Sequence, residues 1–147
     1  MPLLLYLVIA LSATARAQDA DWRYYAADAA STKYAPLTQI DEGNFAELDI
    51  AWRYAPPDGQ IAMRTGRGHS NNRGTPLVVD GVLHYGSPYA ILCAVDAATG
   101  EELWTFDPES WKSRAFVGNL RGIAHWQDGE RQRIFFGTAS DRLYAID

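Results

Sequence analysis

The sequence predicts an all-β fold: an incomplete β-propeller with an N-terminal segment and about two blades of four antiparallel strands. Three observations favour this fold. Short apolar segments alternate with turn signals along residues 75–146, the pattern recurs after about 50 residues, and five Trp, eight Tyr and five Phe favour strands. Closed propellers contain about four to eight blades. We therefore expect that the chain cannot close a ring alone.

Residues 90–104 are the clearest of these segments. The apolar run 90–95 suits a buried strand. Asp96 can hydrogen-bond the turn backbone, and Gly100 can adopt the left-handed conformation that a bulged hairpin needs. Trp104 closes the second strand and offers a large surface for packing between blades, as does Trp52. Residues 142–147 resemble residues 92–96, so a second copy of the motif begins at residue 142.

The remaining strands follow from the same reasoning. Asp80-Gly81 is a strong hairpin signal, and Asp128-Gly129 repeats it in the next blade. The predicted strands of the first blade are Thr75–Val79, Val82–Tyr85, Ala90–Val95 and Glu102–Phe106, and those of the second are Gly122–Trp126, Arg133–Gly137 and Leu143–Ile146.

Upstream of the blades the sequence predicts fewer regular elements. Residues 44–47, Asn-Phe-Ala-Glu, have capping-box spacing, which predicts a short helix that begins near Asn44. The alternation at residues 50–54 predicts a strand that ends before Pro56. Residues 58–74 are rich in Gly, Arg, Asn and Ser, and they predict a long loop of the kind that is commonly functional or mobile.

The first residues predict export. Residues 1–17 have the apolar core and the small-residue cleavage site of a secretory signal peptide, with cleavage after Ala17. The apolar run is too short for a typical membrane span. Residues 18–147 then form the predicted domain, without a transmembrane span, and we expect it in the periplasm. An uncleaved anchor or a mis-assigned start codon remains the alternative, because no Lys or Arg precedes the apolar run.

Composition excludes several functions. The net charge is −5, and removal of residues 1–17 takes away only one charged residue, Arg16. This acidic balance argues against nucleic acid or an anionic membrane as partner. Cys93 is the single cysteine, so no disulfide forms within the chain, and its apolar neighbours predict a buried core thiol. His69, His84 and His125 lack metal-ligand spacing, so no metal site is predicted.

Several motifs follow one another in a fixed order. They are Trp22-x-x-Tyr25, Lys33-Tyr34-Ala35-Pro36-Leu37, Ala51-Trp52-Arg53-Tyr54, Thr75-Pro76-Leu77-Val78-Val79-Asp80-Gly81, Ala94-x-Asp96-x-x-Thr99-Gly100-x-x-x-Trp104 and Arg121-Gly122-Ile123-Ala124-His125-Trp126. In order and spacing the chain resembles the dehydrogenases that depend on pyrroloquinoline quinone (PQQ), which are periplasmic eight-bladed propellers. The resemblance covers nearly all of residues 22–147 and implies the N-terminal fragment of such a quinoprotein.

The resemblance also implies a cofactor site near the propeller axis, where PQQ lies beside Ca²⁺. Arg121 matches the arginine that holds PQQ in the family, and a guanidinium can grip a carboxylate through two parallel hydrogen bonds. Arg73 stands where the family often has an acidic or amide residue, and it either contacts a cofactor carboxylate or is a loop charge. The calcium ligands and the catalytic carboxylate lie in later blades of the family, so no catalytic or metal-binding residue is predicted here.

The implied reaction is oxidation of alcohols or of sugars and polyols by hydride transfer to the quinone, with a cytochrome or a quinone as the electron acceptor. Some alcohol-oxidising relatives have two adjacent cysteines where this chain has Ala115 and Phe116, which favours sugars and polyols slightly. We expect the fragment alone to be inactive. Two alternatives remain: a non-catalytic propeller that serves as a binding or assembly scaffold, and a truncated reading frame without function.

Overall fold

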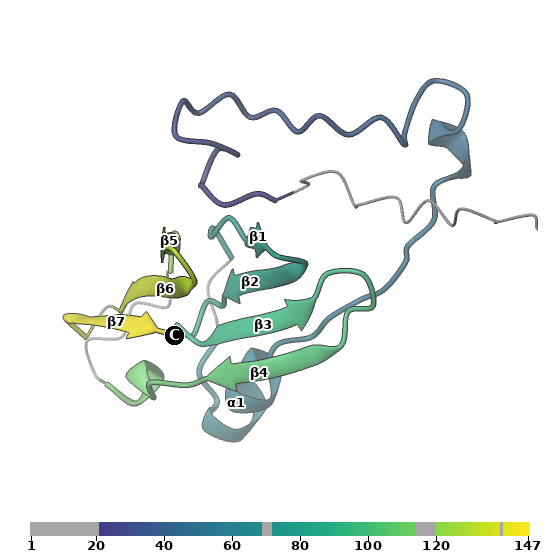
Figure 1. Ribbon diagram of the computed structural model, residues 1–147. Coiled ribbons are helices and arrows are strands. Elements are labelled where there is room, and N and C mark those ends of the chain that lie inside the picture. Colours follow the sequence, from purple (N-terminus) through teal and green to yellow (C-terminus); the bar gives the residue numbers. More distant parts are fainter. Residues whose placement is uncertain (1–20, 69–71, 114–119, 139) are drawn as a thin grey trace, which may run out of the picture.

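The computed structural model describes residues 21–68, 72–113, 120–138 and 140–147, and the predicted signal peptide lies outside them. The strands form two antiparallel sheets, each a meander in which consecutive strands pair (Figure 1). The first sheet has the order β1-β2-β3-β4 and the second β5-β6-β7. The strands are β1 (Leu77–Val79), β2 (Val82–Gly86), β3 (Leu92–Asp96), β4 (Glu102–Phe106), β5 (Ala124–Asp128), β6 (Arg131–Thr138) and β7 (Arg142–Ile146). The predicted order of strands in both blades is confirmed.

Local turn chemistry accounts for the hairpins. Asp80 and Gly81 both have positive φ, 50° and 78°, as a two-residue hairpin turn with the right-handed twist of strands requires. The turn between β3 and β4 is held by Asp96, whose Oδ1 accepts hydrogen bonds from the backbone N–H groups of Ala98 and Thr99 at 3.0 and 2.8 Å. Gly100 follows with φ 76°. The sequence signals at 80–81 and 96–100 thus have the predicted structural roles.

An apolar cluster joins the two sheets. Its buried members come from both sheets and from the segment before β5: Leu77, Leu92, Leu120, Ile123, Ile134 and Phe136. Trp104, Phe106, Tyr144 and Ile146 pack against this cluster. The rings of Phe136 and Tyr144 stack with centroids 5.2 Å apart, and Phe106 meets Tyr144 edge-on at 5.3 Å. The prediction that Trp104 packs between blades is therefore confirmed.

Trp52 docks on the turn between β3 and β4. Its indole Nε1–H donates a hydrogen bond to the carbonyl oxygen of Ala97 at 3.2 Å. Its ring lies so close to Gly100 that a Cβ atom there would come within 2.6 Å of Trp52 Cδ2. Trp52 thus packs on the first sheet and not between the two sheets as predicted, and the strand predicted for residues 50–54 is also wrong. These residues pair with no strand of the described chain. Their alternation reflects side chains docked on the first sheet, and not a place within a sheet.

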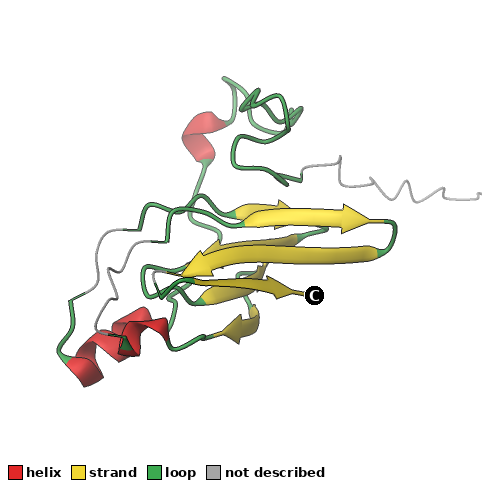
Figure 2. Cartoon of the chain, turned by 90° about the vertical axis from the view of Figure 1, so that its left-hand side faces the viewer, coloured by secondary structure: helices red, strands yellow, loops and turns green. Residues whose placement is uncertain are grey.

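The loop predicted for residues 58–74 is also wrong in its first half. Residues Asp58–Thr65 form an α-helix, α1, which follows Pro57 and ends at Gly66 with φ 67°. Figure 2 shows this helix at one end of the strands. The helix is held by tertiary contacts: Ile61 is buried against Tyr89, Ile91 and Cys93, and the carboxylate Oδ1 of Asp58 accepts the backbone N–H of Tyr89 at 2.9 Å. A short polar sequence that contains Gly59 gives little helical periodicity, so the pattern alone did not reveal it.

The short helix near Asn44 is confirmed as a single 3₁₀ turn, η1 (Phe45–Glu47), but the predicted capping is wrong. The side chain of Asn44 makes no capping hydrogen bond. Its Oδ1 instead accepts the backbone N–H of Asp41 at 2.9 Å, and Asp41 Oδ1 accepts the N–H of Gly43 at 2.8 Å. Turn-forming side chains thus compete with the cap for the same backbone groups.

Two further predictions concern the core and the membrane. Cys93 is completely buried, and burial raises the pKa of its thiol to about 11, so the predicted core thiol is confirmed. No helix in the described part of the chain is long and apolar enough to cross a membrane.

Candidate functional site

The segments that lead into β1 and β5 meet at one end of the two sheets. A Cβ atom on Gly74 would lie 3.4 Å from the carbonyl oxygens of both Leu120 and Gly86. Arg73 precedes Gly74 and Arg121 follows Leu120 in the chain. The structure therefore brings together Gly74 and Leu120, which are the chain neighbours of Arg73 and Arg121, although the two segments are far apart in the sequence.

Both arginine side chains are exposed at this end. Neither guanidinium forms an ion pair or a hydrogen bond with any residue in the described ranges. Near Arg121 in the chain, Leu120 and Ile123 are only 6% and 9% exposed and belong to the apolar cluster between the sheets. Two exposed guanidinium groups without acidic partners among the described residues are suited to bind a ligand that carries carboxylates, because each offers paired donors in a fixed plane.

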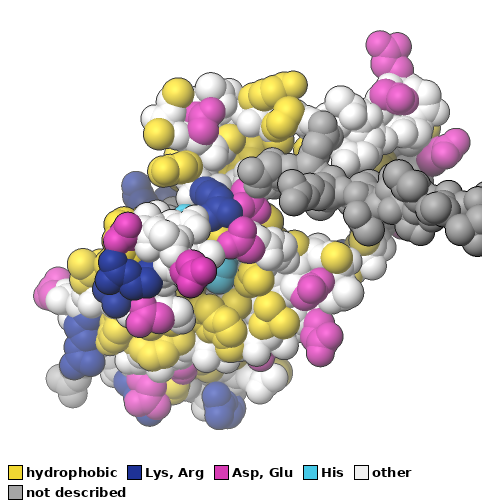
Figure 3. All heavy atoms as spheres, viewed as in Figure 1, with side chains coloured by type: hydrophobic (Ala, Val, Ile, Leu, Met, Phe, Trp, Pro, Cys, Tyr) yellow, Lys and Arg dark blue, Asp and Glu magenta, His cyan; other side chains and the backbone are white. Residues whose placement is uncertain are grey.

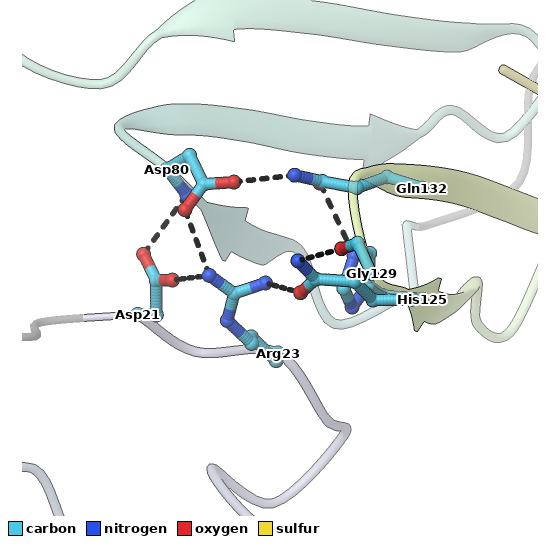
Figure 4. A network of polar contacts seen from close by, with 7 residues as sticks. Asp21, Arg23, Asp80, His125, Gly129 and Gln132 are labelled. Atoms are coloured by element: carbon cyan, nitrogen blue, oxygen red, sulfur yellow. Dashed lines mark hydrogen bonds and ion pairs between the residues drawn. The ribbon is translucent and has the colours of Figure 1, made fainter.

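The opposite end of the sheets carries a polar network that the sequence analysis missed (Figure 4). The guanidinium of Arg23 donates to Asp80 Oδ1 at 2.8 Å and to Gln127 Oε1 at 2.9 Å, and it pairs with Asp21 at 2.5 Å. Gln132 Nε2 donates to the other carboxylate oxygen of Asp80 at 2.6 Å. The hydrogen bond from Gln132 and the charge of Arg23 hold the pKa of Asp80 below its usual range.

This network joins the N-terminal segment, the β1–β2 turn and the β5–β6 hairpin. Residues 21–23 also lie beside β1, because Trp22 and Val78 exchange two backbone hydrogen bonds. In contrast to Arg73 and Arg121, the charge of Arg23 is matched by carboxylates. We therefore assign the network to holding the two sheets together, and the free cations mark the other end as the candidate binding site.

A small cavity of about 170 Å³ lies between the sheets and is lined in part by His84 and His125. His84 Nδ1 is buried without a hydrogen-bond partner among the described residues, and its ring lies 5.9 Å from Trp104. Burial, and then the nearby His125, lower the pKa of His84. The described ranges contain no group of three or more His, Cys, Asp or Glu side chains that could hold a metal ion, and His69 lies outside them.

An apolar groove of about 600 Å³ lies on the first sheet, between residues 52–56 and the side chains of Leu83, Tyr85 and Val95. Several large apolar side chains are exposed elsewhere, including Leu103 on β4 and Leu143 on β7. Figure 3 shows apolar side chains grouped on the face that it displays, between acidic and basic ones. Arg53 is the one charged residue among those that line the groove in the described chain, so we do not assign the groove a catalytic role.

Comparison with known proteins gives a consistent result. Residues 22–147 match the model of a protein family named PQQ, which is described as the β-propeller domain of glucose, ethanol and alcohol dehydrogenases. The 1-butanol dehydrogenase (cytochrome c) of Thauera butanivorans is 35% identical over 143 residues, which are 95% of this chain and 19% of that protein. The dehydrogenase subunit of the alcohol dehydrogenase (quinone) of Gluconacetobacter polyoxogenes is 35% identical over 131 residues, 86% of this chain and 16% of that protein.

A solved structure agrees with these matches. The quinohemoprotein alcohol dehydrogenase ADHIIG of Pseudomonas putida superposes with a TM-score of 0.71 at 29% identity, and the match covers 88% of this chain and 18% of that one. The chain thus spans less than a fifth of the length of each of these proteins. The matches confirm the predicted incomplete β-propeller and the predicted family resemblance.

Proposed function

We propose that this chain, which belongs to the β-propeller family of PQQ-dependent glucose, ethanol and alcohol dehydrogenases, forms the N-terminal part of a dehydrogenase. In that enzyme it would supply one side of the PQQ site. The observation that carries the proposal is the meeting of the segments before β1 and β5, with Arg73 and Arg121 exposed beside it. Family membership favours an enzyme over the non-catalytic scaffold.

The residues of this chain fit the cofactor. PQQ carries three carboxylates, and the two guanidinium groups are unmatched by acidic partners in the described part of the chain. Arg121 would hold one carboxylate or quinone oxygen through paired donors, and Arg73 would contact a second carboxylate. When bound, PQQ accepts the hydride of the substrate, while the protein binds and orients it. Leu120 and Ile123 belong to the buried apolar cluster, which keeps water out of the interface between the sheets.

The finer assignments follow from the relatives and the sequence. The relatives are named as alcohol dehydrogenases, linked in name to cytochrome c or to quinone, which supports an alcohol substrate and one of these two electron acceptors. Sugars and polyols are the second candidate, because Ala115 and Phe116 replace the paired cysteines of some alcohol-oxidising members. We further propose a signal peptide at residues 1–17, a periplasmic location, and a Ca²⁺ ion held by oxygen ligands from other parts of the full-length enzyme.

A binding titration tests the proposed cofactor contact. PQQ is added to the purified chain and binding is followed by quenching of tryptophan fluorescence. We expect Arg121→Gln to raise the Kd about 10- to 100-fold, since a hydrogen bond to a charged group contributes about 1.5–3 kcal/mol. Arg73→Gln should raise it less.

The matched control is Arg64→Gln, which removes the same charge from an exposed position on α1. Equal Kd values for Arg121→Gln and Arg64→Gln would refute the contact. It would also be refuted if the wild-type chain bound PQQ no more tightly than the double variant Arg73→Gln/Arg121→Gln does. With PQQ and Ca²⁺ added, we expect no substrate-dependent dye reduction by the chain alone, because the catalytic carboxylate of the family lies outside it.

A further inference from the structure

Gly86, the last residue of β2, lies where a side chain from the segment before β5 packs. It is buried, and a Cβ atom built on it would lie 2.1 Å from Leu120 Cδ2, 3.2 Å from Leu120 Cγ and 3.3 Å from Ile123 Cγ2. Carbon atoms that are not bonded do not approach to 2.1 Å, so the Leu120 side chain occupies the volume that any side chain at position 86 would need. Gly86 does not have a positive φ, so space, and not backbone conformation, requires the glycine.

The same place is fixed from the other side by Gly74. Its position lies against the carbonyl oxygens of Leu120 and Gly86, each 3.4 Å from a Cβ built there. Three backbone segments therefore stack closely: the one before β1, the end of β2 and the one before β5. Two glycines allow this approach, and Arg73 and Arg121 flank it.

Leu120 links this stack to the candidate cofactor site. Leu120 is 6% exposed within the apolar cluster, and the next residue is Arg121. One peptide unit, about 3.8 Å, separates the two Cα atoms, so a shift of Leu120 moves the origin of the Arg121 side chain with it. A binding group must be held within about 0.5 Å of its productive geometry by the residues that support it.

We infer that Gly86 is a positioning residue for Arg121: the absent side chain at position 86 admits Leu120, and the seated Leu120 sets the place from which Arg121 reaches PQQ. The inference rests on the proposed function, since it assigns Gly86 a role in the binding of the same cofactor. It predicts that filling this space changes cofactor affinity without touching either arginine.

The test is a set of three variants titrated with PQQ. Gly86→Ala should weaken PQQ binding about tenfold, the loss of one of two paired hydrogen bonds. Gly122→Ala is the control: it adds the same methyl group next to Arg121, where no atom lies within 4 Å, and should change the Kd less than about twofold. The double variant Gly86→Ala/Leu120→Ala removes the clashing side chain and should recover at least half of the loss on a logarithmic scale. Urea unfolding of each variant establishes that it is folded under assay conditions.

A second readout does not need PQQ. In ¹H–¹⁵N spectra of the chain, Gly86→Ala should shift the amide signals of residues 120–123 more than those of β6 and β7, and Gly122→Ala should disturb only its sequence neighbours. If Arg121→Gln loses PQQ and Gly86→Ala does not, the positioning role is overturned and the proposed function stands. If the wild-type chain does not bind PQQ, the proposed function fails. Separately, the positioning role would be overturned if the amide signals of residues 120–123 did not shift in Gly86→Ala.

Discussion

Replacing Gly100 with Ala tests how Trp52 is docked on the first sheet. Gly100 has φ 76°, and an L-residue in that conformation costs about 1–2 kcal/mol. The new Cβ would also lie 2.6 Å from Trp52 Cδ2, whereas ordinary contacts begin near 3.4 Å. The indole must therefore retreat and lose its hydrogen bond to Ala97, which contributes about 1 kcal/mol net. The expected loss of stability is about 2–3 kcal/mol.

Gly81→Ala separates the two contributions. Gly81 has nearly the same φ, 78°, but no atom lies within 4 Å of a Cβ built there. We expect this variant to lose only the conformational cost, about 1–2 kcal/mol. The difference between the two variants, about 1 kcal/mol, measures the Trp52 contact. In a Trp52→Ala background, Gly100→Ala should cost no more than Gly81→Ala does.

The assay is urea unfolding followed by circular dichroism, because Trp52 itself would alter the fluorescence signal. The free energy of unfolding and its dependence on urea are compared for the wild type and the four variants. Equal destabilisation by Gly100→Ala and Gly81→Ala would refute the reasoning, since the clash with Trp52 would then have no energetic effect.

Three further results are expected. Burial, and then His125, lower the pKa of His84 in the folded chain, so the unfolded chain binds a proton that the folded chain excludes. The free energy of unfolding should therefore fall as the pH drops below about 6.5. In urea melts at several pH values, His84→Gln should flatten this slope, and an unchanged slope would be the contrary result. Arg23→Gln should cost about 1 kcal/mol or less in low salt, with a smaller loss in high salt, because its carboxylate partners are partly exposed; a loss insensitive to salt would contradict an electrostatic tie. Cys93, with a pKa raised to about 11 by burial, should react with iodoacetamide at pH 8 only after unfolding, and rapid labelling of the folded chain would contradict the buried thiol.

Local chemistry explains why so much of the fold could be predicted. The hairpin at Asp80-Gly81 needs two residues of positive φ, and few residues other than Asn, Asp and Gly adopt it readily. The turn at Asp96 uses a side chain that bonds its own backbone two and three residues on. Such signals act within a few residues, so they can be recognised without knowledge of the partner strands. The strand predicted for residues 50–54 was wrong because alternation appears wherever one side of an extended chain is buried, with or without a pairing strand.

In the candidate site, too, local features could be predicted from the sequence and contacts between distant residues could not. The strand order, the turns and the packing of Trp104 between the sheets could be predicted from the sequence, as could the choice of Arg73 and Arg121, whose role in cofactor binding stays a prediction. Three contacts became visible only in the folded chain: the segments before β1 and β5 meet at Gly74, Leu120 fills the space beside Gly86, and Arg23 joins Asp80 to Gln127. Propensities and turns depend on neighbours along the chain, whereas these contacts join residues tens of positions apart, and their geometry is set only when the two sheets bury their common apolar cluster.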